Sequence, residues 1–352
     1  MQVLETLLIA TLLLGFLVFI HEGGHFLVAR AFKVRVTEFM IGFPGPHIGF
    51  TRKGTKFGIT AIPLGGYAKV CGMLPAPNNP IFKDILGFVY DRGEVTYEEV
   101  AKVFSLEIKE AFDLLEVLVD WGSLEHPTQK RTDNTYRTPA RKGLPAGTAY
   151  EVNDLEAFYK EEELQQYCSI SFWKRACILA AGPIMNLLYA MLMFVIIYSI
   201  LGIDLQNTVT GEVKHIVLNP IDSIVAGFRY IGTVVVAILG LFNPATAAET
   251  VSNSTSIIGI AVLSRDAFEA GLVNILSFSA IISVSLGLMN LLPIPPLDGG
   301  RLLIEIIQKI ARRPVPVRVQ NYLSTAGFVL FMVFFIVMVN QDIQRFIFGN
   351  WG

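Results

Sequence analysis

Two histidines and a glutamate near the start of the chain have the residue types and the spacing of a zinc hydrolase centre. His21 and His25 are one helical turn apart, and Glu22 directly follows the first histidine. On a helix both imidazoles share one face, so their nitrogens can bind one Zn²⁺ ion while the Glu22 carboxylate reaches a water molecule on that ion. The pattern therefore predicts metal-assisted hydrolysis.

This motif lies at the end of an apolar run. Between Leu4 and Ile20 the only charged residue is Glu5. Charged and imidazole groups at membrane depth are costly unless they pair or coordinate an ion, so a functional site is favoured over a chance match. Gly23 and Gly24 are poor helix formers, but their small size would let a neighbouring helix or a substrate backbone come close.

A second stretch supplies a third candidate ligand. Asn290 is followed by three prolines and then by Asp298. The prolines remove helix donors and end an apolar segment near membrane depth, and the freed backbone must line a protein-covered cavity. Zn²⁺ would satisfy the Asp298 carboxylate in that setting, and two histidines with one carboxylate leave a fourth position open for water. A helix-capping aspartate is the alternative.

The other histidines and the three cysteines form no comparable pattern. His126 and His215 fall in loop-like or soluble stretches, and His47 is the only rival to Asp298 as third ligand. The cysteines are odd in number and lack C-x-x-C spacing, which favours neither a disulfide framework nor a thiolate zinc site. We interpret them as packing residues.

The composition indicates an α-helical polytopic membrane protein. Of 352 residues, 53% are hydrophobic and 16% are charged, which is too apolar for a soluble globular protein. The net charge of −2 gives no support for nucleic-acid binding. The first apolar run lacks the basic start and the cleavage site of a signal peptide, so we expect a retained membrane span.

Four apolar segments are long enough to cross a hydrocarbon core of about 30 Å. They cover residues 3–29, 172–201, 270–292 and 322–339. A fifth apolar stretch, residues 224–242, contains Arg229, and a consistent topology favours an interfacial helix there. Arg30, Lys33 and Arg35 directly follow the first span. The positive-inside rule therefore places the His-Glu-His motif toward the cytoplasmic side of a cell inner membrane and both termini outside.

Two regions outside the spans have their own character. From Val34 to Val70, short apolar strands broken by Gly and Pro predict membrane-associated β-hairpins. An exposed edge there could bind an extended peptide by strand addition, and an ordinary surface hairpin is the alternative. Residues 74–168 are charged, and helices expected over 82–91, 96–104 and 106–121 with a following hairpin suggest a small soluble α+β, winged-helix-like insert. The last of these helices is acidic, so we expect protein contact or gating rather than DNA binding.

These features predict six consecutive regions. They are the first span with the membrane-associated hairpins (1–73), the cytoplasmic insert (74–168), the second span (169–202), an external segment with the interfacial helix (203–268), the third span with Leu297-Asp298-Gly299-Gly300 (269–301), and a cytoplasmic segment with the fourth span (302–352).

Four motifs together resemble the site-2 protease family, specifically its bacterial four-span, RseP-like group of intramembrane zinc metalloproteases. The motifs are His21-Glu22-Gly23-Gly24-His25, Ile62-Pro63-Leu64-Gly65-Gly66-Tyr67, Gly182-Pro183 with Asn186, and Asn290 through Gly299. The resemblance covers about two thirds of the chain. By itself, Asn186 is expected to face a neighbouring helix, with substrate binding as the alternative.

The resemblance implies cleavage of transmembrane segments during regulated intramembrane proteolysis. Its substrates would be membrane-anchored proteins in the lipid bilayer, such as anti-sigma factors or signal-peptide remnants. It implies that His21, His25 and Asp298 bind Zn²⁺ and that Glu22 is the catalytic base. The hairpin around Gly65 and Gly66 would receive substrate as an added strand, and Asn290 and Pro293 would hold unwound substrate.

Two features depart from that group. No PDZ domain is evident after the second span, because residues 202–218 are too few to fold unaided. The insert is also not part of the family pattern. Two alternative functions remain open on the sequence, a membrane metal transporter and a membrane-tethered winged-helix regulator with an inert protease core.

Overall fold

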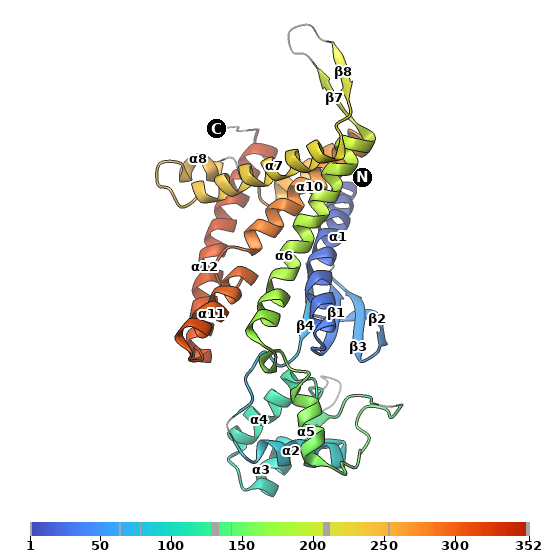
Figure 1. Cartoon of the computed structure of the whole chain (residues 1–352), viewed down its shortest axis with the longest axis vertical. Coiled ribbons are helices and arrows are strands. Elements are labelled where there is room, and N and C mark those ends of the chain that lie inside the picture. The colour runs from blue at the N-terminus through green and yellow to red at the C-terminus, as the bar shows by residue number, and fades with distance from the viewer. Residues whose placement is uncertain are drawn as a thin grey trace. The chain divides into compact units, whose positions relative to one another are not determined.

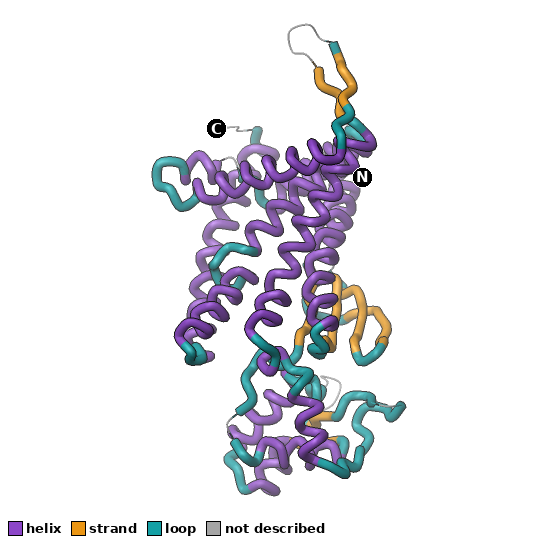
Figure 2. Tube along the Cα trace, in the orientation of Figure 1, coloured by secondary structure: helices purple, strands orange, loops and turns teal. Residues whose placement is uncertain are grey.

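A computed structural model of the chain describes residues 2–62, 65–77, 79–127, 134–141, 143–206, 212–252 and 254–349. Helices dominate it, with small groups of strands (Figures 1 and 2). The chain divides into two compact units. The helical unit contains Met1–His25, Pro63–Gly66 and Leu179–Gly352, and the sheet unit contains Phe26–Ile62 and Tyr67–Ile178.

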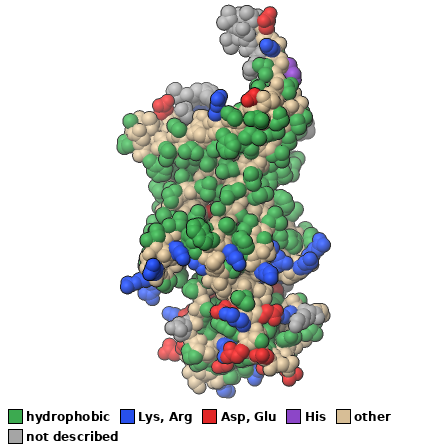
Figure 3. All heavy atoms as spheres, in the orientation of Figure 1, with side chains coloured by type: hydrophobic (Ala, Val, Ile, Leu, Met, Phe, Trp, Pro, Cys, Tyr) green, Lys and Arg blue, Asp and Glu red, His purple; other side chains and the backbone are tan. Residues whose placement is uncertain are grey.

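Long apolar helices form the helical unit. They are α1 (Gln2–Ala31), α6 (Phe172–Val195) continued by a π-helix (Ile196–Leu201), α7 (Pro220–Gly240), α8 (Ala247–Ser252), α9 (Ile257–Glu269), α10 (Leu272–Asn290), α11 (Asp298–Ala311), and α12 (Val317–Asp342) continued by a π-helix (Ile343–Ile347). Strands β7 (Ile203–Gln206) and β8 (Val213–Ile216) pair antiparallel between α6 and α7. Hydrophobic side chains cover much of the visible helical surface in Figure 3.

Five described helices are long and apolar enough to cross a membrane. They are Gln2–Ala31, Phe172–Leu201, Pro220–Gly240, Leu272–Asn290 and Val317–Phe346. The protein is therefore a multi-pass membrane protein. The four spans expected from the sequence fall on four of these helices, and the fifth is α7. In Figure 1, α7 runs across α6 and α10 rather than along them, and Gly227 packs against Met191 and Phe194 of α6.

Small residues let the helices of this unit approach closely. A Cβ on Gly24 of α1 would lie 2.5 Å from the Ala181 carbonyl oxygen of α6, and one on Gly287 of α10 would lie 2.9 Å from the Pro183 carbonyl oxygen. The missing side chains thus allow backbone contact between α6 and its two neighbours. Beyond them, apolar side chains of α6, of the π-helix that continues it and of α10 form a buried cluster, which comprises Ala190, Met193, Phe194, Ile197, Ala280 and Val284.

The proline-containing loop after α10 folds back against the start of α11. Added Cβ atoms on Gly299 and Gly300 would each lie 2.2 Å from backbone atoms of this loop, and one on Gly327 of α12 would lie 1.5 Å from the Pro295 carbonyl oxygen. No side chain fits at these three positions. The glycines that follow Asp298 are therefore needed for the packing that fixes the position of Asp298 at the first turn of α11.

The sheet unit begins with a four-stranded mixed sheet. Its strands are β1 (Val36–Ile41), β2 (His47–Arg52), β3 (Thr55–Thr60) and β4 (Gly66–Val70), in the order β2-β3-β1-β4. Strands β2 and β3 form the expected type of hairpin, whereas β1 pairs parallel with β3. The expectation of hairpins alone was therefore incomplete. Strand β4 lies at one edge of the sheet.

The insert follows the sheet as a compact helical module. It contains α2 (Phe82–Arg92), β5 (Glu94–Thr96), α3 (Tyr97–Phe104), α4 (Ile108–Asp120), β6 (Thr135–Arg137), α5 (Leu155–Glu163) and a short 3₁₀ turn (Tyr167–Ser169). Strands β5 and β6 pair antiparallel, and Glu125 bridges to Arg137. Thr96 and Glu99 form a capping box at the start of α3, because the side chain of each bonds the other's backbone N–H. Part of the expected hairpin, residues 128–133, lies outside the described residues.

A buried carboxylate joins the insert to the chain that leaves α1. Glu162 of α5 is fully buried and accepts two hydrogen bonds from Arg35, at 2.8 and 2.9 Å. Arg141 and Ser123 donate to the same carboxylate at 2.6 and 2.7 Å. Burial alone would raise the pKa of Glu162, but the two guanidinium groups and the hydroxyl outweigh burial and lower that pKa below its usual range.

Candidate metal centre

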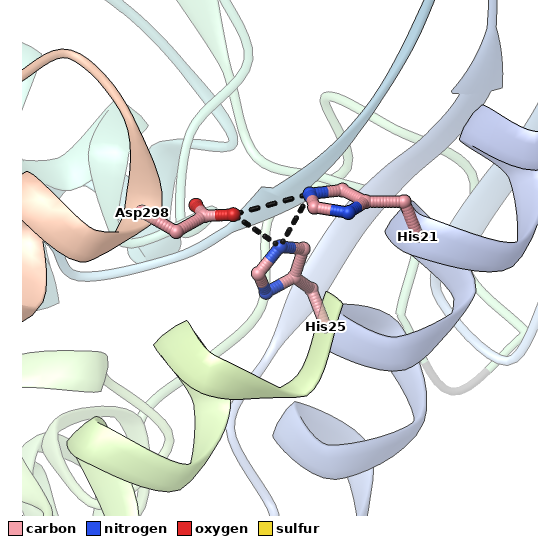
Figure 4. A group of neighbouring side chains, drawn as sticks. All are labelled: His21, His25 and Asp298. Carbon is pink, nitrogen blue, oxygen red and sulfur yellow. Dashed lines mark hydrogen bonds and ion pairs between the residues drawn. The ribbon is translucent and has the colours of Figure 1, made fainter. Parts of the chain in front are cut away.

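Three potential metal-binding atoms from opposite ends of the chain converge in the helical unit (Figure 4). The Nε2 atoms of His21 and His25, both on α1, are 3.3 Å apart. Asp298, the first residue of α11, places its Oδ2 atom 3.1 Å from His21 Nε2 and 3.2 Å from His25 Nε2. Both histidines are buried, with 6% and 9% of their surface exposed, and the Asp298 side chain is 20% exposed.

The spacing of these atoms fits a tetrahedral metal ion. Ligands that each lie about 2.0–2.1 Å from a tetrahedral zinc ion are about 3.3–3.4 Å from one another. The three observed separations are 3.1, 3.2 and 3.3 Å. The two imidazole nitrogens and the carboxylate oxygen face a common point. A cation at that point would accept a lone pair from each of the three atoms at once. Among the described residues, no other group of His, Cys, Asp and Glu meets this condition.

The missing side chain of Gly182 leaves room beside these atoms. Gly182 lies on α6, and an added Cβ would be 2.3 Å from His25 Nε2 and 2.8 Å from His21 Nε2. Both distances are too short for a real carbon contact. Position 182 therefore borders the space that the donor atoms face. The sequence marked Gly182 only as part of a family motif, because its contact with α1 depends on how the two helices cross.

Asn186 lies one turn further along α6, against the other side of His21. Its side chain is fully buried, and its Nδ2 atom is 3.2 Å from His21 Nδ1. Its Oδ1 atom is buried with no hydrogen-bond partner among the described residues. A buried, unpaired amide oxygen costs about 1–3 kcal/mol. Asn186 thus faces a neighbouring helix, as expected, but the specific partner is one of the candidate metal ligands, which the sequence did not predict.

The candidate base lies on the helix that carries two of the candidate ligands, and two substrate-binding candidates lie on the segment that leads to the third. Glu22 follows His21 on α1 and is partly buried. Asn290 is the last residue of α10, and its Nδ2 donates to the Leu286 carbonyl at 3.0 Å. Pro293 is exposed in the loop that leads to Asp298.

The other two substrate-binding candidates lie at the start of the edge strand. Gly65 has a positive φ of 96°, a conformation that glycine adopts without steric cost. Gly66 is the first residue of β4, and both glycines are partly exposed. Pro63 and Leu64, which belong to the same motif, lie outside the described residues.

The remaining histidines and cysteines are placed elsewhere. His47 is an exposed residue at the start of β2 and belongs to no three-residue metal group in the described part of the chain. His215 pairs with Asp204 at 2.7 Å, and His126 lies 3.5 Å from Glu116. None of the three cysteines, which all lie in the described part of the chain, forms a disulfide, and Cys71 is buried as a packing residue would be.

Comparison with known proteins gives matches along nearly the whole chain. A family model described as peptidase family M50 matches residues 9–334. A protein named zinc metalloprotease RasP from Bacillus licheniformis is 25% identical, over 97% of this chain and 99% of that protein. Geobacillus kaustophilus has a zinc metalloprotease RasP that is 24% identical, over 98% and 99%. A protein from Bacillus subtilis named regulator of sigma-W protease RasP is 25% identical, over 97% and 99%.

Proposed function

The chain belongs to peptidase family M50 and is an intramembrane zinc metalloprotease of the site-2 type, and from this premise we propose that His21, His25 and Asp298 bind its zinc ion and that Glu22 is its catalytic base. The observation that carries this assignment is the convergence of three potential ligands within 3.1–3.3 Å of one another. The names of the relatives support zinc as the metal. A metal transporter or a regulator with an inert core is not favoured.

Each residue of the centre has a separate task in peptide hydrolysis. Zinc, when bound here, supplies a Lewis acid that polarises the scissile carbonyl and acidifies the attacking water. The neutral imidazoles of His21 and His25 and the anionic Asp298 would hold it. Glu22 accepts a proton from the attacking water and later transfers that proton to the leaving amine. The partial burial of these groups limits access of bulk water, which strengthens electrostatic interactions between them.

We propose that substrate is unwound and held as an extended strand. A helical substrate keeps its carbonyl groups in backbone hydrogen bonds, so local unwinding must precede attack. Strand β4 lies at a sheet edge and begins at Gly66, directly after Gly65, which supports strand addition there. Asn290 and Pro293 flank the start of the loop that leads to Asp298, which supports a role in holding the unwound segment.

Four spans, α1, α6, α10 and α12, are proposed, with α7 lying along the membrane interface. If α7 also crossed the membrane, α10 would run in the opposite direction, and its end would lie on the membrane side opposite to that of His21 and His25. The contacts of Asp298 with both histidines oppose that arrangement. Helix α9 has 13 residues and cannot restore the direction, since about 20 residues are needed to cross.

Basic residues support an orientation in a bacterial cytoplasmic membrane. Arg30, Lys33 and Arg35 follow the first span, and Arg312 and Arg313 precede the last. By the positive-inside rule these ends are cytoplasmic, so the metal centre would lie toward the cytoplasmic side and both termini outside. Residues 202–218 include the short β7–β8 pair. This supports the proposal that the protein selects its substrates without a PDZ domain at that position.

Membrane-anchored proteins, such as anti-sigma factors or signal-peptide remnants, are the proposed substrates. The Bacillus subtilis relative is named as a regulator of sigma-W protease, which supports this class. The insert is proposed to be a winged-helix-like module that contacts protein or gates access. The order α2-β5-α3-α4-β6 supports that interpretation, and the acidic α4 argues against DNA binding.

The role of Glu22 is tested with the substitution Glu22→Gln in the full-length protein. The variant should retain zinc but lose cleavage of a reconstituted transmembrane substrate by at least about 100-fold, because general acid–base catalysis contributes about 10²–10⁴-fold. Glu5→Gln, a change of the same chemistry near the start of α1, is the matched control and should cleave normally. Full activity of Glu22→Gln in the same vesicles would contradict the assignment.

A further inference from the structure

Helix α6 presents two uncharged residues, one turn apart, to the candidate metal centre. Gly182 faces the Nε2 atoms of both histidines, and Asn186 faces the Nδ1 atom of His21. Residues four apart share a helix face. The same side of α6 therefore borders both the space for the ion and the Nδ1 edge of the His21 ring. Neither residue supplies a metal-binding atom, and neither has a role in the mechanism above.

The ring nitrogen of His21 that carries the proton determines whether Asn186 must donate or accept the hydrogen bond between them. A neutral imidazole carries one proton, and the nitrogen that binds a metal must keep its lone pair. His21 points its Nε2 atom toward Asp298 and His25. Its proton must then lie on Nδ1, which becomes a hydrogen-bond donor. Among the described residues, the Asn186 amide is the only group within hydrogen-bonding distance of that atom.

When metal is bound, the Asn186 amide must therefore have the orientation opposite to the one in this structure. With Nδ2 toward His21 Nδ1, the amide is a donor that faces a donor, and Oδ1 is left buried and unpaired. Rotation of the terminal amide by half a turn exchanges the two atoms and keeps the shape of the side chain. Oδ1 then accepts a hydrogen bond from His21 Nδ1–H.

The backbone around Asn186 is held in place from α10. Ser283 donates a hydrogen bond from its Oγ atom to the Asn186 carbonyl at 2.9 Å, and both residues are fully buried. Gly287 lies so close that an added Cβ would be 3.3 Å from the Asn186 Cβ. These contacts fix the side chain next to His21 before any metal binds.

We propose that Asn186 is a positioning residue that holds His21 in the tautomer able to bind zinc, and that Gly182 keeps open the space that the ion occupies. A hydrogen bond to the second nitrogen of a metal-bound histidine fixes its tautomer and ring orientation. A side chain at position 182 would compete with the ion for the space in front of both Nε2 atoms. This inference rests on the proposed metal ligands.

Two substitutions of Asn186 in the full-length protein separate its acceptor role from packing, and a third substitution tests Gly182. Asn186→Leu removes the polar group at similar size, and Asn186→Asp keeps an acceptor oxygen in the ionised side chain but has no N–H. Zinc affinity is measured by competition with a chelator, so the readout does not depend on proteolysis. Asn186→Leu should bind zinc about 10–100-fold more weakly, whereas Asn186→Asp should stay close to the wild type. Gly182→Ala should lose most of its zinc.

The control for Gly182→Ala is Gly232→Ala in α7, where an added Cβ meets nothing within 4 Å. It should bind zinc as the wild type does. Equal zinc affinity of Asn186→Leu and the wild type would overturn the role of Asn186, as would an equal loss in Asn186→Leu and Asn186→Asp. Unchanged zinc affinity of Gly182→Ala would overturn the role of Gly182.

A measurement on the wild-type protein covers the case in which a variant does not fold. Nuclear magnetic resonance of isotope-labelled histidine in the zinc-loaded protein should show a proton on Nδ1 of His21, and a proton on Nε2 would overturn the proposal. The ligand assignment itself fails in a different way, because zinc would then stay bound after substitution of His21. Zinc binding that depends on His21 but not on Asn186 would overturn this inference alone.

Discussion

At the scale of single residues, the metal centre depends on side chains that carry no charge as much as on those that do. His21, His25 and Asp298 are the proposed ligands, but Gly182 leaves room in front of their facing atoms and Asn186 contacts the far side of the His21 ring. Each buried polar group in such a site needs a partner, because an unpaired one loses its hydration without compensation. In our proposal, a metal ion is the partner that all three donors share.

A second buried polar site, around Glu162 in the sheet unit, gives a prediction about stability. The pKa of Glu162 is lower in the folded protein than its usual value of 4.5. Its contribution to stability is therefore fully present above pH 4.5 and is lost as the pH falls through the folded pKa. Replacing Glu162 by Gln leaves Arg35 and Arg141 without their buried anion. We expect a loss of about 3–5 kcal/mol in unfolding free energy at pH 7.

Urea unfolding of the purified full-length protein, followed by tryptophan fluorescence, measures this effect, because Trp121 is buried in the core of the insert. The difference between wild type and Glu162→Gln should shrink as the pH falls below about 4.5. Glu161→Gln removes an exposed carboxylate that also pairs with Arg141 and should change stability little. A difference for Glu162→Gln that does not vary with pH would contradict the electrostatic explanation.

At the scale of helices and strands, some features were predictable from the sequence and others were not. The helices that contain the expected spans follow from apolar runs, because a long apolar segment in lipid must satisfy its backbone internally. The parallel pairing of β1 with β3 was not predicted, since strand direction depends on contacts beyond the local pattern. The contacts of Gly182 and Asn186 with α1 were missed for a similar reason, because they depend on how two helices cross.

Helix α7 is the element whose placement gives the clearest prediction. If α7 lies along the interface, residues before and after it are on the same side of the membrane. Single cysteines at Lys214 and Ala245, introduced into a variant without the three natural cysteines, should both react with an impermeant maleimide added from outside. The exposed positions of both residues make them suitable for labelling.

A cysteine at Arg313, just before the last span, is the control for the inside. It should react only after the membrane is permeabilised. Labelling of the Ala245 cysteine under that condition alone would mean that α7 crosses the membrane, and the four-span topology would be wrong.

At the scale of the whole molecule, the candidate active site exists only in the folded chain. His21 and Asp298 are 277 positions apart in sequence, so an intervening fold must bring them together. The residue types were predictable, because His-Glu-His and an aspartate after prolines are local patterns. Their distances were not, since they depend on α1, α6, α10 and the loop before α11 packing together.

The zinc content of the purified protein and of its Asp298→Ala variant tests the central claim most directly. We expect about one zinc ion per wild-type chain, since a zinc site of this kind holds a single ion, and loss of most of it in Asp298→Ala. His47→Ala, which removes the rival third ligand, should keep the wild-type content. Retention of zinc by Asp298→Ala together with its loss in His47→Ala would contradict the account.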